Sequence, residues 1–430
     1  MRKLLILADD LSGAADCANA CISSGLNAIV TFEDADDDIA SEVLSIDCDT
    51  RHLPPEEAAE RVARIMRKYT LKDPNLLVFK KVDSTLRGNV AAEIRAVLEE
   101  RRLHADDGQR IVAVMAPAFP VGGRTTIAGY QIVHGVPLHE TEMWIHNGLS
   151  GIAHLPTMLQ KVGLQTALLP LALVRSSHSQ LSSAMQRFSS EADVLICDVE
   201  NDEDLKAIAE ASFSLGRGTI WAGSAGLAYQ FPHAANLPKG PHSLDLPQFA
   251  QGPILFVVGS MSSVSHQQAV LLERKAAVTA IHILPSVLLD GPSTLPWAIA
   301  ADAIDASLKS GDDTLIVLDA NEWVDLLERR RLTDALGLML APYANMVGAL
   351  VATGGETARA ILDRWGVASL VMLGDVELGL PYSFTRLNDQ PLPVLTKAGA
   401  FGSEGTLLSS WHFLTDLLRK RDYVSAERSS

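Results

Sequence analysis

The sequence predicts an α/β protein built from two α/β domains with largely parallel sheets and a cleft between them. Short runs rich in Val, Ile and Leu recur along the chain, and stretches with helical spacing of apolar residues separate them. The runs are continuously apolar, which indicates strands buried on both faces of a sheet and therefore parallel strands joined by crossover helices. At 430 residues the chain is also long for a single hydrophobic core, so two domains are expected.

The first domain is predicted to span residues 1–235. Its strands are expected at 3–8, 27–32, 43–47, 76–80, 111–115, 193–197 and 218–222. Its helices are expected at 13–24, 55–69, 90–104, 176–188 and 203–214. The second of these helices has the clearest beginning, because Pro55 is followed by Glu56 and Glu57, whose carboxylates favour the positive end of the helix dipole.

A change in composition marks the domain boundary. The stretch 232–253 has no periodicity and contains five prolines, which is typical of a linker: Pro232, Pro238, Pro241, Pro247 and Pro253. The second domain is predicted to span residues 250–430. Its strands are expected at 254–258, 279–284, 314–318, 348–352 and 369–373. Its helices are expected at 264–276, 297–309, 321–341, 356–366 and 404–420.

The charge balance and hydropathy exclude some kinds of partner. The chain has 36 Lys and Arg against 52 Asp and Glu, a net charge of −16, which disfavours nucleic acid because a nucleic-acid-binding surface must be basic. No window approaches the roughly 18 apolar residues of a membrane span. Asp9 and Asp10 also end the N-terminal apolar run before it reaches the ~7–15 residues of an export signal. We therefore expect a cytoplasmic protein with neither a membrane nor nucleic acid as a partner.

Two adjacent carboxylates follow the first predicted strand. Asp9 and Asp10 come directly after the apolar run, and Ser12 and Gly13 lead into the next helix. Ligands of parallel sheets gather at the carboxyl ends of the strands, so this is a candidate site. One carboxylate could simply cap the helix, whereas two could also share a metal ion or abstract a proton, because neighbouring carboxylates bind cations or raise one pKa. Both interpretations remain open at this point.

Cations follow two other strands of the first domain. Arg51 comes shortly after the strand at 43–47 and could hold a carboxylate through two hydrogen bonds, although an exposed loop arginine fits the sequence equally well. Residues 79–89 read Phe-Lys-Lys-Val-Asp-Ser-Thr-Leu-Arg-Gly-Asn and surround a strand-to-helix turn. Two lysines, an Arg, an Asp, two hydroxyls and a glycine suit an oxyanionic ligand that carries hydroxyl groups.

Glycine-rich turns follow strands of the second domain. They are Val-Val-Gly-Ser-Met-Ser at 257–262, Val-Ala-Thr-Gly-Gly-Glu-Thr-Ala at 351–358 and Lys-Ala-Gly-Ala-Phe-Gly-Ser at 397–403. Such turns expose backbone N–H groups to phosphate, so three in one domain favour a nucleotide-phosphate site. The chain has neither the Gly-x-x-x-x-Gly-Lys-Ser/Thr motif of P-loop NTPases nor Gly-x-Gly-x-x-Gly after a strand, which disfavours both of those classes.

Together and in this order, the motifs resemble those of the four-carbon acid sugar kinase family over nearly the whole chain. The segments that carry the resemblance are 8–14, 49–51, 81–89, 259–260, 353–358 and 397–402. The form of the third segment resembles the D-threonate and D-erythronate kinase branch. The resemblance implies an N-terminal domain that binds the sugar acid and a C-terminal domain that binds ATP. It also implies transfer of the γ-phosphoryl group to the terminal hydroxyl of a four-carbon sugar acid, with D-threonate as the expected substrate.

The resemblance further implies roles for individual residues. Sugar-acid contacts would come from Ser12, Arg51, Lys81, Val82, Asp83, Ser84 and Arg87. ATP contacts would come from Ser260, Thr353, Gly354, Gly355, Glu356 and Gly399. Asp10 is the expected base or hydroxyl-orienting group, with Asp9 second, and Mg²⁺ would bridge the β- and γ-phosphates with its protein ligands left open. The resemblance also allows a homodimer.

Alternatives to D-threonate phosphorylation remain. D-Erythronate differs from D-threonate in the stereochemistry of one hydroxyl, and 3-oxo-tetronate is the substrate of a related branch. In a different class, an NAD-dependent sugar-acid dehydrogenase would need the same carboxylate-binding cations but would bind NAD instead of ATP. A non-enzymatic sugar-acid sensor would have no use for the glycine turns of the second domain.

Overall fold

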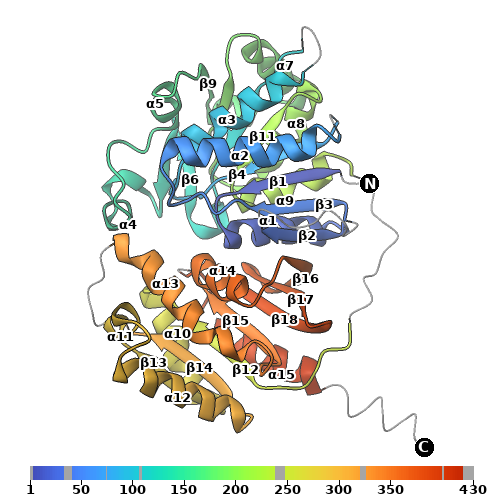
Figure 1. Cartoon of the computed structure of the whole chain (residues 1–430). Coiled ribbons are helices and arrows are strands. Elements are labelled where there is room, and N and C mark those ends of the chain that lie inside the picture. Colours follow the sequence, from blue (N-terminus) through green and yellow to red (C-terminus); the bar gives the residue numbers. More distant parts are fainter. Residues whose placement is uncertain are drawn as a thin grey trace, which may run out of the picture. The chain divides into compact units, whose positions relative to one another are not determined.

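The structure is a computed structural model that describes residues 3–32, 41–73, 75–105, 109–237, 247–319, 326–399 and 401–419. The chain divides into two compact units, Met1–His242 and Ser243–Ser430. Each unit is a layered α/β structure with a sheet at its centre and helices packed on the faces of the sheet (Figure 1). The predicted α/β class with largely parallel sheets is therefore confirmed.

A parallel sheet forms the centre of the first unit, with the strand order β2-β3-β1-β4-β11-β5-β10-β9. The strands are β1 (Leu4–Ala8), β2 (Ala28–Phe32), β3 (Val43–Asp47), β4 (Leu77–Lys81), β5 (Ala113–Ala116), β9 (Thr166–Leu169), β10 (Val194–Cys197) and β11 (Ile220–Gly223). Leu4, the first residue of β1, pairs with Val43, the first residue of β3, and with Leu77, the first residue of β4, so the three strands begin at the same level of the sheet. Their carboxyl ends consequently meet at one edge of the sheet, where ligands of parallel sheets bind.

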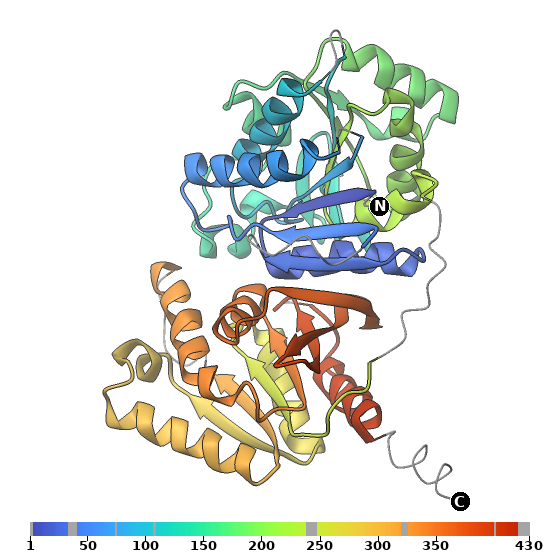
Figure 2. The same cartoon turned by 45° about the vertical axis from the view of Figure 1, so that its right-hand side comes forward.

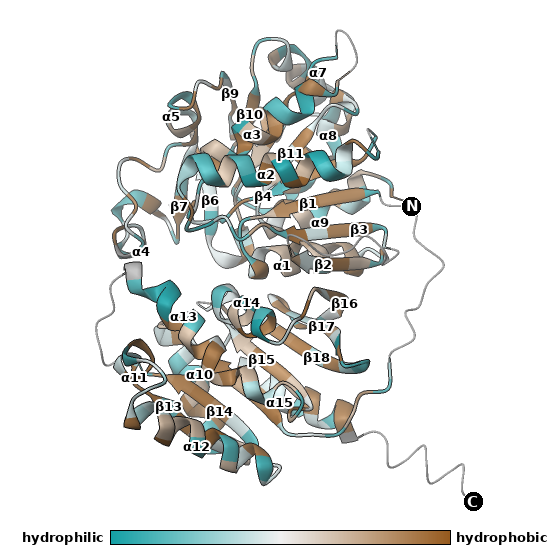
Figure 3. Cartoon of the chain, in the orientation of Figure 1, coloured by the Kyte–Doolittle hydropathy of each residue, from teal (hydrophilic) through white to brown (hydrophobic). Residues whose placement is uncertain are grey.

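Helices cover both faces of this sheet. On one face, α2 (Pro55–Thr70) packs against α3 (Val90–Leu103), and their apolar side chains share a buried core with the strands. The other layer contains α1 (Leu11–Ser23), α7 (His178–Ser189), α8 (Asp202–Ser212) and α9 (Ala225–Ala234) (Figure 2). Shorter helices are α4 (Glu142–His146), α5 (Leu155–Gln160) and α6 (Leu171–Val174). The central strands are mostly hydrophobic, whereas α2 mixes hydrophilic and hydrophobic residues, as a surface helix does (Figure 3).

A separate antiparallel sheet follows β5 and consists of β6 (Arg124–Ile127), β7 (Tyr130–Val133) and β8 (Val136–Pro137). The turn between β6 and β7 is formed by Ala128 and Gly129, whose backbone N–H groups each donate to the carboxylate of Asp198 at 2.9 Å. Thr126 also pairs with Val199, so the hairpin is fixed to the segment after β10. This hairpin was not predicted from the sequence, because its strands are short and partly polar.

The second unit has its own central sheet, with the order β13-β14-β12-β15-β18-β17-β16. The strands are β12 (Ile254–Val258), β13 (Val278–Ile283), β14 (Asp313–Leu318), β15 (Ala349–Thr353), β16 (Ser369–Glu377), β17 (Leu380–Leu387) and β18 (Gln390–Lys397). Neighbouring strands are parallel from β13 to β18, whereas β17 is antiparallel to both of its neighbours. The helices are α10 (Ser263–Lys275), α11 (Pro285–Asp290), α12 (Leu295–Lys309), α13 (Leu326–Leu340), α14 (Gly355–Arg364) and α15 (Thr406–Arg419). Among them, α10 packs with α15 and α13 packs with α14.

Each strand predicted from the sequence begins within two residues of its expected start, but β9, β17 and β18 of the central sheets were not predicted, nor were β6, β7 and β8. The signal for the last two was the pair Asn388 and Asp389, which both have positive φ (47° and 65°) and form the tight turn between β17 and β18. The assignment of Pro232 to the linker was wrong, because this proline lies inside α9. Its position near the end of that helix limits the loss of backbone hydrogen bonds.

Residues 321–325 of the helix predicted at 321–341 lie outside the described residues, and the described part is α13. In the described ranges, no helix combines the length and the apolar character needed to cross a membrane.

Candidate functional site

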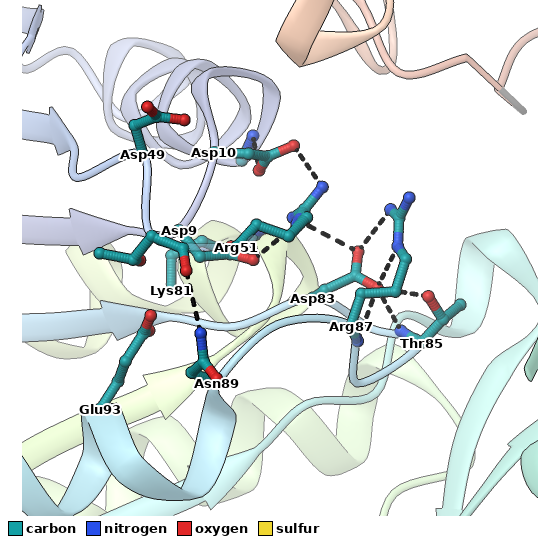
Figure 4. A network of polar contacts seen from close by, with 12 residues as sticks. Asp9, Asp10, Asp49, Arg51, Lys81, Asp83, Thr85, Arg87, Asn89 and Glu93 are labelled. Atoms are coloured by element: carbon teal, nitrogen blue, oxygen red, sulfur yellow. Dashed lines mark hydrogen bonds and ion pairs between the residues drawn. The ribbon is translucent and has the colours of Figure 1, made fainter. Parts of the chain in front are cut away.

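Three strand ends of the first unit form a cluster of charged residues (Figure 4). β1 is followed by Asp9 and Asp10, β3 leads to Arg51, and β4 ends at Lys81 and is followed by Asp83. These residues are far apart in the sequence. The parallel pairing of β1 with β3 and β4 brings them together.

Arg51 is the centre of this cluster. Its Nε donates to Asp9 Oδ2 at 2.8 Å, and its Nη1 donates to Asp10 Oδ2 at 2.7 Å. Its Nη2 lies 3.9 Å from Asp83 Oδ1, too far for a hydrogen bond. The Arg51 side chain is 7% exposed, so these interactions are largely shielded from water. One guanidinium therefore bridges the two adjacent carboxylates and offsets their mutual repulsion.

The same charges shift the pKa values of the cluster. Burial alone raises the pKa of Asp9, but the charge of Arg51 and of the neighbouring lysines outweighs burial and lowers this pKa below its ordinary value. Burial alone lowers the pKa values of Arg51 and Lys81, but the charges of Asp10 and Asp9 reverse this effect and raise both. Asp9 therefore stays ionised, and both cations stay protonated, at neutral pH.

Asp10 also has a structural role. Its Oδ1 accepts a hydrogen bond from the N–H of Gly13 at 2.9 Å and so caps α1. The capping interpretation of the sequence is correct, and the same carboxylate is ion-paired with Arg51. Gly13 in turn makes room for Lys81, because a Cβ at Gly13 would collide with Lys81 Nζ and lie 2.7 Å from Asp10 Oδ1.

A second ion pair shapes the loop after β4. Arg87 donates from Nε to Asp83 Oδ2 and from Nη2 to Asp83 Oδ1, both at 2.9 Å. Thr85 donates its N–H and its hydroxyl to the same carboxylate. Burial alone raises the pKa of Asp83, but Arg87 and then Arg51 hold this pKa well below its ordinary range. The Asp83 carboxylate is thus ionised and already occupied by protein donors.

A buried ion pair joins β4 to α3. Lys80 Nζ lies 2.7 Å from Glu93 Oε2, and the two side chains are 0% and 2% exposed. The same ammonium donates to the carbonyls of Leu7 at 3.1 Å and of Lys81 at 2.8 Å. Lys80 therefore ties the ends of β1 and β4, which carry the charged cluster, to the helix that follows.

Several buried polar atoms of the cluster have no hydrogen-bond partner among the residues that the structure describes: Asp9 Oδ1, Ser12 Oγ, Thr50 Oγ1 and Arg51 Nη2. Buried polar atoms are nearly always paired, so their concentration at one place indicates a polar ligand. One carboxylate oxygen, two hydroxyls and one guanidinium N–H suit a small molecule with several hydroxyl groups and a carboxylate.

The remaining predicted sugar-acid residues have different environments. Val82 has its side chain in the hydrophobic core, and its N–H donates to Gly223 O at 2.9 Å, so its side chain makes no polar contact. Ser84 is half-buried, and its carbonyl accepts a hydrogen bond from Gln131 Nε2 at 2.7 Å. Gln131 was not predicted, because it lies on the unpredicted β6–β7 hairpin.

Asn89 was also not predicted as a site residue. It stands at the N-cap position of α3, but its side chain donates to the carbonyls of Thr50 and Leu53 at 3.0 and 2.9 Å instead of capping the helix. Asn89 therefore holds the turn that contains Arg51. Its place within the charged motif after β4 was the local signal.

The glycine-rich turns of the second unit lie together. β12, β15 and β18 are adjacent parallel strands, and the turns after them contain Ser260, Gly354 and Gly399. A Cβ at Gly399 would collide with Ser260 Oγ, and a Cβ at Gly354 would lie 4.0 Å from Ser260 Cβ. The N–H of Gly354 donates to the carbonyl of Lys397 at 2.7 Å. Three motifs that are remote in sequence are thus one cluster.

Two helices begin at this glycine cluster. Ser262 caps α10 by accepting from the N–H of Ser265 at 3.1 Å, and its hydroxyl donates to Gly399 O at 2.8 Å. Gly354 precedes α14 with φ of +93°, a conformation that favours glycine. Helix N-termini present unpaired N–H groups and a positive dipole end, which suits phosphate.

The other predicted ATP residues lie at the same helix start. Gly355 is the first residue of α14, and Glu356 lies in its first turn. Thr353 ends β15, and its Oγ1 is buried without a hydrogen-bond partner among the described residues. The structure therefore brings all six predicted ATP residues to the ends of three neighbouring strands.

Lys397 organises the last glycine turn. Its Nζ donates to the carbonyls of Ala398, Gly399 and Phe401 at 2.9, 3.1 and 2.9 Å. Burial lowers the pKa of this lysine to about 8, and the charge of Glu377 opposes that shift. The ammonium thus holds a loop of backbone carbonyls together; Ala400 of this loop lies outside the described residues.

Comparisons with known proteins identify the family. Residues 4–231 match the model of a sugar-binding N-terminal domain, and residues 255–407 match that of a nucleotide-binding C-terminal domain. A D-threonate kinase from Cupriavidus necator is 37% identical over 418 residues, which cover 96% of this chain and 98% of the relative. The chain belongs to the four-carbon acid sugar kinase family.

Other relatives agree with this assignment. A D-erythronate kinase from Heliobacterium modesticaldum is 25% identical over 462 residues, which cover 98% of this chain and 99% of the relative. A crystal structure from Salmonella typhimurium LT2, 19% identical, shares the fold with a TM-score of 0.78 and covers 95% of this chain and 99% of that chain. The predicted family and the predicted class of small-molecule kinase are confirmed, in preference to the dehydrogenase alternative.

Proposed function

We propose that this kinase transfers the γ-phosphoryl group of ATP to the terminal (4-) hydroxyl of a four-carbon sugar acid, with D-threonate as the preferred substrate. The observation that carries the proposal is the set of buried, unpartnered polar atoms beside cations: Asp9 Oδ1, Ser12 Oγ, Thr50 Oγ1 and Arg51 Nη2. The relative named D-threonate kinase is 37% identical and the one named D-erythronate kinase is 25% identical, which favours D-threonate. D-Erythronate and 3-oxo-tetronate are the alternative substrates.

The sugar acid binds in this proposal to residues of the first unit, namely Ser12, Arg51, Lys81, Val82, Asp83, Ser84 and Arg87. Arg51 keeps Nη2 for the substrate, because Asp9 and Asp10 hold its other two nitrogens. The hydroxyl of Ser12 and the free oxygen of Asp9 bind substrate hydroxyls. Lys81 adds positive charge beside the N-terminus of α1.

ATP binds in this proposal to the glycine cluster of the second unit: Ser260, Thr353, Gly354, Gly355, Glu356 and Gly399. The described residues contain no group of three or more His, Cys, Asp or Glu side chains arranged to hold a metal ion. The nucleotide phosphates would therefore supply most ligands of Mg²⁺, which commonly binds through phosphates and one or two carboxylates. The bound ion would neutralise charge on the transferring phosphoryl group.

Asp10 is the proposed base or hydroxyl-orienting group. Phosphoryl transfer demands mainly positioning, so a carboxylate that orients the attacking hydroxyl is sufficient. The side chain of Asp10 is 12% exposed and that of Asp9 is 4% exposed, so Asp10 is the more accessible to a substrate hydroxyl. Asp9 is the second candidate.

A substrate panel tests the proposed reaction. The protein is incubated with ATP, Mg²⁺ and, separately, D-threonate, D-erythronate and 3-oxo-tetronate, and ADP release is followed. We expect ADP release that depends on the sugar acid, the highest kcat/KM for D-threonate, and a 4-phosphate product by NMR. The proposal would be contradicted if none of these acids caused ADP release and if NAD, but not ATP, raised the melting temperature.

The variant Asp10→Asn tests the role of the carboxylate. Asparagine caps a helix as well as aspartate, so α1 should keep its N-cap. The loss of the ion pair with Arg51 should lower the melting temperature only in part, because Asp9 still pairs with that guanidinium. Without the negative charge, kcat should fall about 10²- to 10⁴-fold while the KM for ATP stays constant. Asp305→Asn, an exposed carboxylate on α12, is the matched control. A near-normal kcat for Asp10→Asn would assign the role to another residue.

A further inference from the structure

Arg124 is a cation that none of the sequence motifs includes. It is the first residue of β6 and is half-buried. Its Nη1 donates to the carbonyl of Gly122, while its Nε is buried without any hydrogen-bond partner. In the part of the chain that the structure describes, no carboxylate forms an ion pair with Arg124. A guanidinium normally pairs its fork with a carboxylate or phosphate, so a buried Nε without such a partner indicates an anionic ligand.

The hairpin that carries Arg124 is docked on the loop of the sugar-acid cluster. Gln131 on β7 donates from Nε2 to Ser84 O at 2.7 Å, and its Oε1 accepts from Thr126 Oγ1 on β6 at 2.9 Å. The backbone of Arg124 pairs with Phe119 in both directions, at 2.8 and 3.0 Å. The base of the Arg124 side chain is thus held in a fixed position relative to Ser84.

The charges of that same loop shift the pKa of the Arg124 guanidinium. Burial lowers its pKa, the charge of Asp83 raises it, and the charge of Arg87 lowers it. Asp83 does not neutralise Arg124, however, because Arg87 holds both oxygens of that carboxylate at 2.9 Å. Arg124 therefore contributes a positive charge to the cluster that no described carboxylate matches directly.

The other cations of the cluster are already matched. Arg51 pairs with two carboxylates, Asp9 and Asp10. Arg87 pairs with Asp83, and the pKa of Lys81 is raised by Asp10 and Asp9 although burial lowers it. A substrate carboxylate would therefore form its ion pair with Arg124, whose guanidinium fork suits two parallel hydrogen bonds.

We propose that Arg124 is a substrate-binding residue that holds the carboxylate of the sugar acid and thereby makes the enzyme prefer an acid to its uncharged amide. This inference rests on the proposed function of the first unit. It leaves Arg51 Nη2 and the unpartnered hydroxyls for the hydroxyl groups of the substrate. The preference for an acid thus arises from a residue of the β6–β7 hairpin, outside the strand ends that carry the motifs.

The test combines a change in the enzyme with a change in the substrate. The kcat/KM values of the wild type and of Arg124→Gln are measured with D-threonate and with D-threonamide, which lacks the negative charge. Losing a charge-assisted pair should lower kcat/KM for D-threonate on the order of 10- to 100-fold, mainly through KM. For D-threonamide the loss should be less than about 3-fold, since the amide cannot form the ion pair.

Three further variants make the result specific. Arg124→Lys keeps the charge but not the fork, so it should recover part of the lost kcat/KM. Arg187→Gln removes an arginine that lies over the ring of Phe188 on α7 and should leave both substrates unaffected. An equal loss with both substrates for Arg124→Gln would overturn the inference, because a purely structural role predicts that result. A loss of acid preference in Lys81→Met, with Arg124→Gln unchanged, would also overturn it.

Direct binding separates this inference from the proposed reaction. Titration calorimetry of D-threonate against the full chain without nucleotide should give a Kd that Arg124→Gln raises by the same factor as KM. If the wild type binds D-threonate but releases no ADP, the proposed reaction fails while weaker binding to Arg124→Gln still supports the inference. If the wild type does not bind D-threonate, the inference is overturned together with the substrate assignment.

Discussion

Replacement of Lys80 by Met is the most direct test of how the charged cluster is supported. Lys80 and Glu93 form an ion pair at 2.7 Å with 0% and 2% of their side chains exposed. In Lys80→Met, Glu93 Oε2 loses this partner, and Oε1 already has none. A carboxylate with no compensating charge would then be buried between β4 and α3.

The magnitude follows from that burial. Breaking one partner of a buried ion pair costs about 3–5 kcal/mol, because the remaining charge has lost its solvation without compensation. Two further hydrogen bonds, to the carbonyls of Leu7 and Lys81, are lost as well. We therefore expect the free energy of unfolding of the first unit to fall by at least about 3 kcal/mol. The KM for the sugar acid should also rise, since Lys80 ties together the ends of β1 and β4.

The change in the free energy of unfolding is measured by urea unfolding, with hydrogen exchange of the backbone amides of the first unit as the readout. The matched control is Lys309→Met, which breaks an ion pair with Asp305 of the same 2.7 Å length whose side chains are 66% and 37% exposed. That exposed pair should contribute less than about 1 kcal/mol. The double variant Lys80→Met with Glu93→Leu removes both charges and should recover at least about 2 kcal/mol relative to Lys80→Met alone.

The pH dependence supplies a second check with a definite sign. Burial alone lowers the pKa of Lys80, but the charge of Glu93 outweighs burial and raises this pKa above its ordinary value in the folded protein. The stability that Lys80 contributes is therefore fully present below the pKa of an unfolded lysine and is lost as the pH rises through the folded-state pKa, so the stability difference between the wild type and Lys80→Met should be constant from about pH 6 to 9 and shrink only at higher pH. A cost below about 1 kcal/mol, or costs of the single changes that simply add in the double variant, would refute the reasoning.

Two other predictions concern positioning within the two clusters. Gly13→Ala should leave the melting temperature near that of the wild type, because alanine favours the helix. The added methyl group should displace Lys81 and raise the KM for the sugar acid about 10-fold, with the KM for ATP unchanged. An unchanged KM for the sugar acid would disprove this role of Gly13. For Lys397, the KM for ATP should rise as the pH increases through about 8, because loss of the proton weakens the hold on three carbonyls, and steady-state kinetics of Lys397→Met should show no such rise. A wild-type profile that is flat in this pH range would contradict the prediction.

The sequence by itself determined the α/β class and the strand ends at which the polar residues lie. Continuous apolar runs mark buried parallel strands, and the first polar residues after each run must lie at an edge of the sheet. The positions of Asp9, Asp10, Arg51 and Lys81 could therefore be predicted from local pattern alone. The glycine turns of the second unit could be predicted for the same reason.

Only the tertiary structure decided which charges pair with which. Arg51 bridges Asp9 and Asp10 because β1 and β3 are neighbouring parallel strands in one register. Strand order and register depend on contacts between distant segments, and local periodicity carries no information about those contacts. The same holds for Arg124, whose strand is short and polar and becomes part of the cluster through Gln131 and Ser84. The sequence thus located the charges, whereas the fold determined which of them are neutralised by the protein and which are left for a ligand.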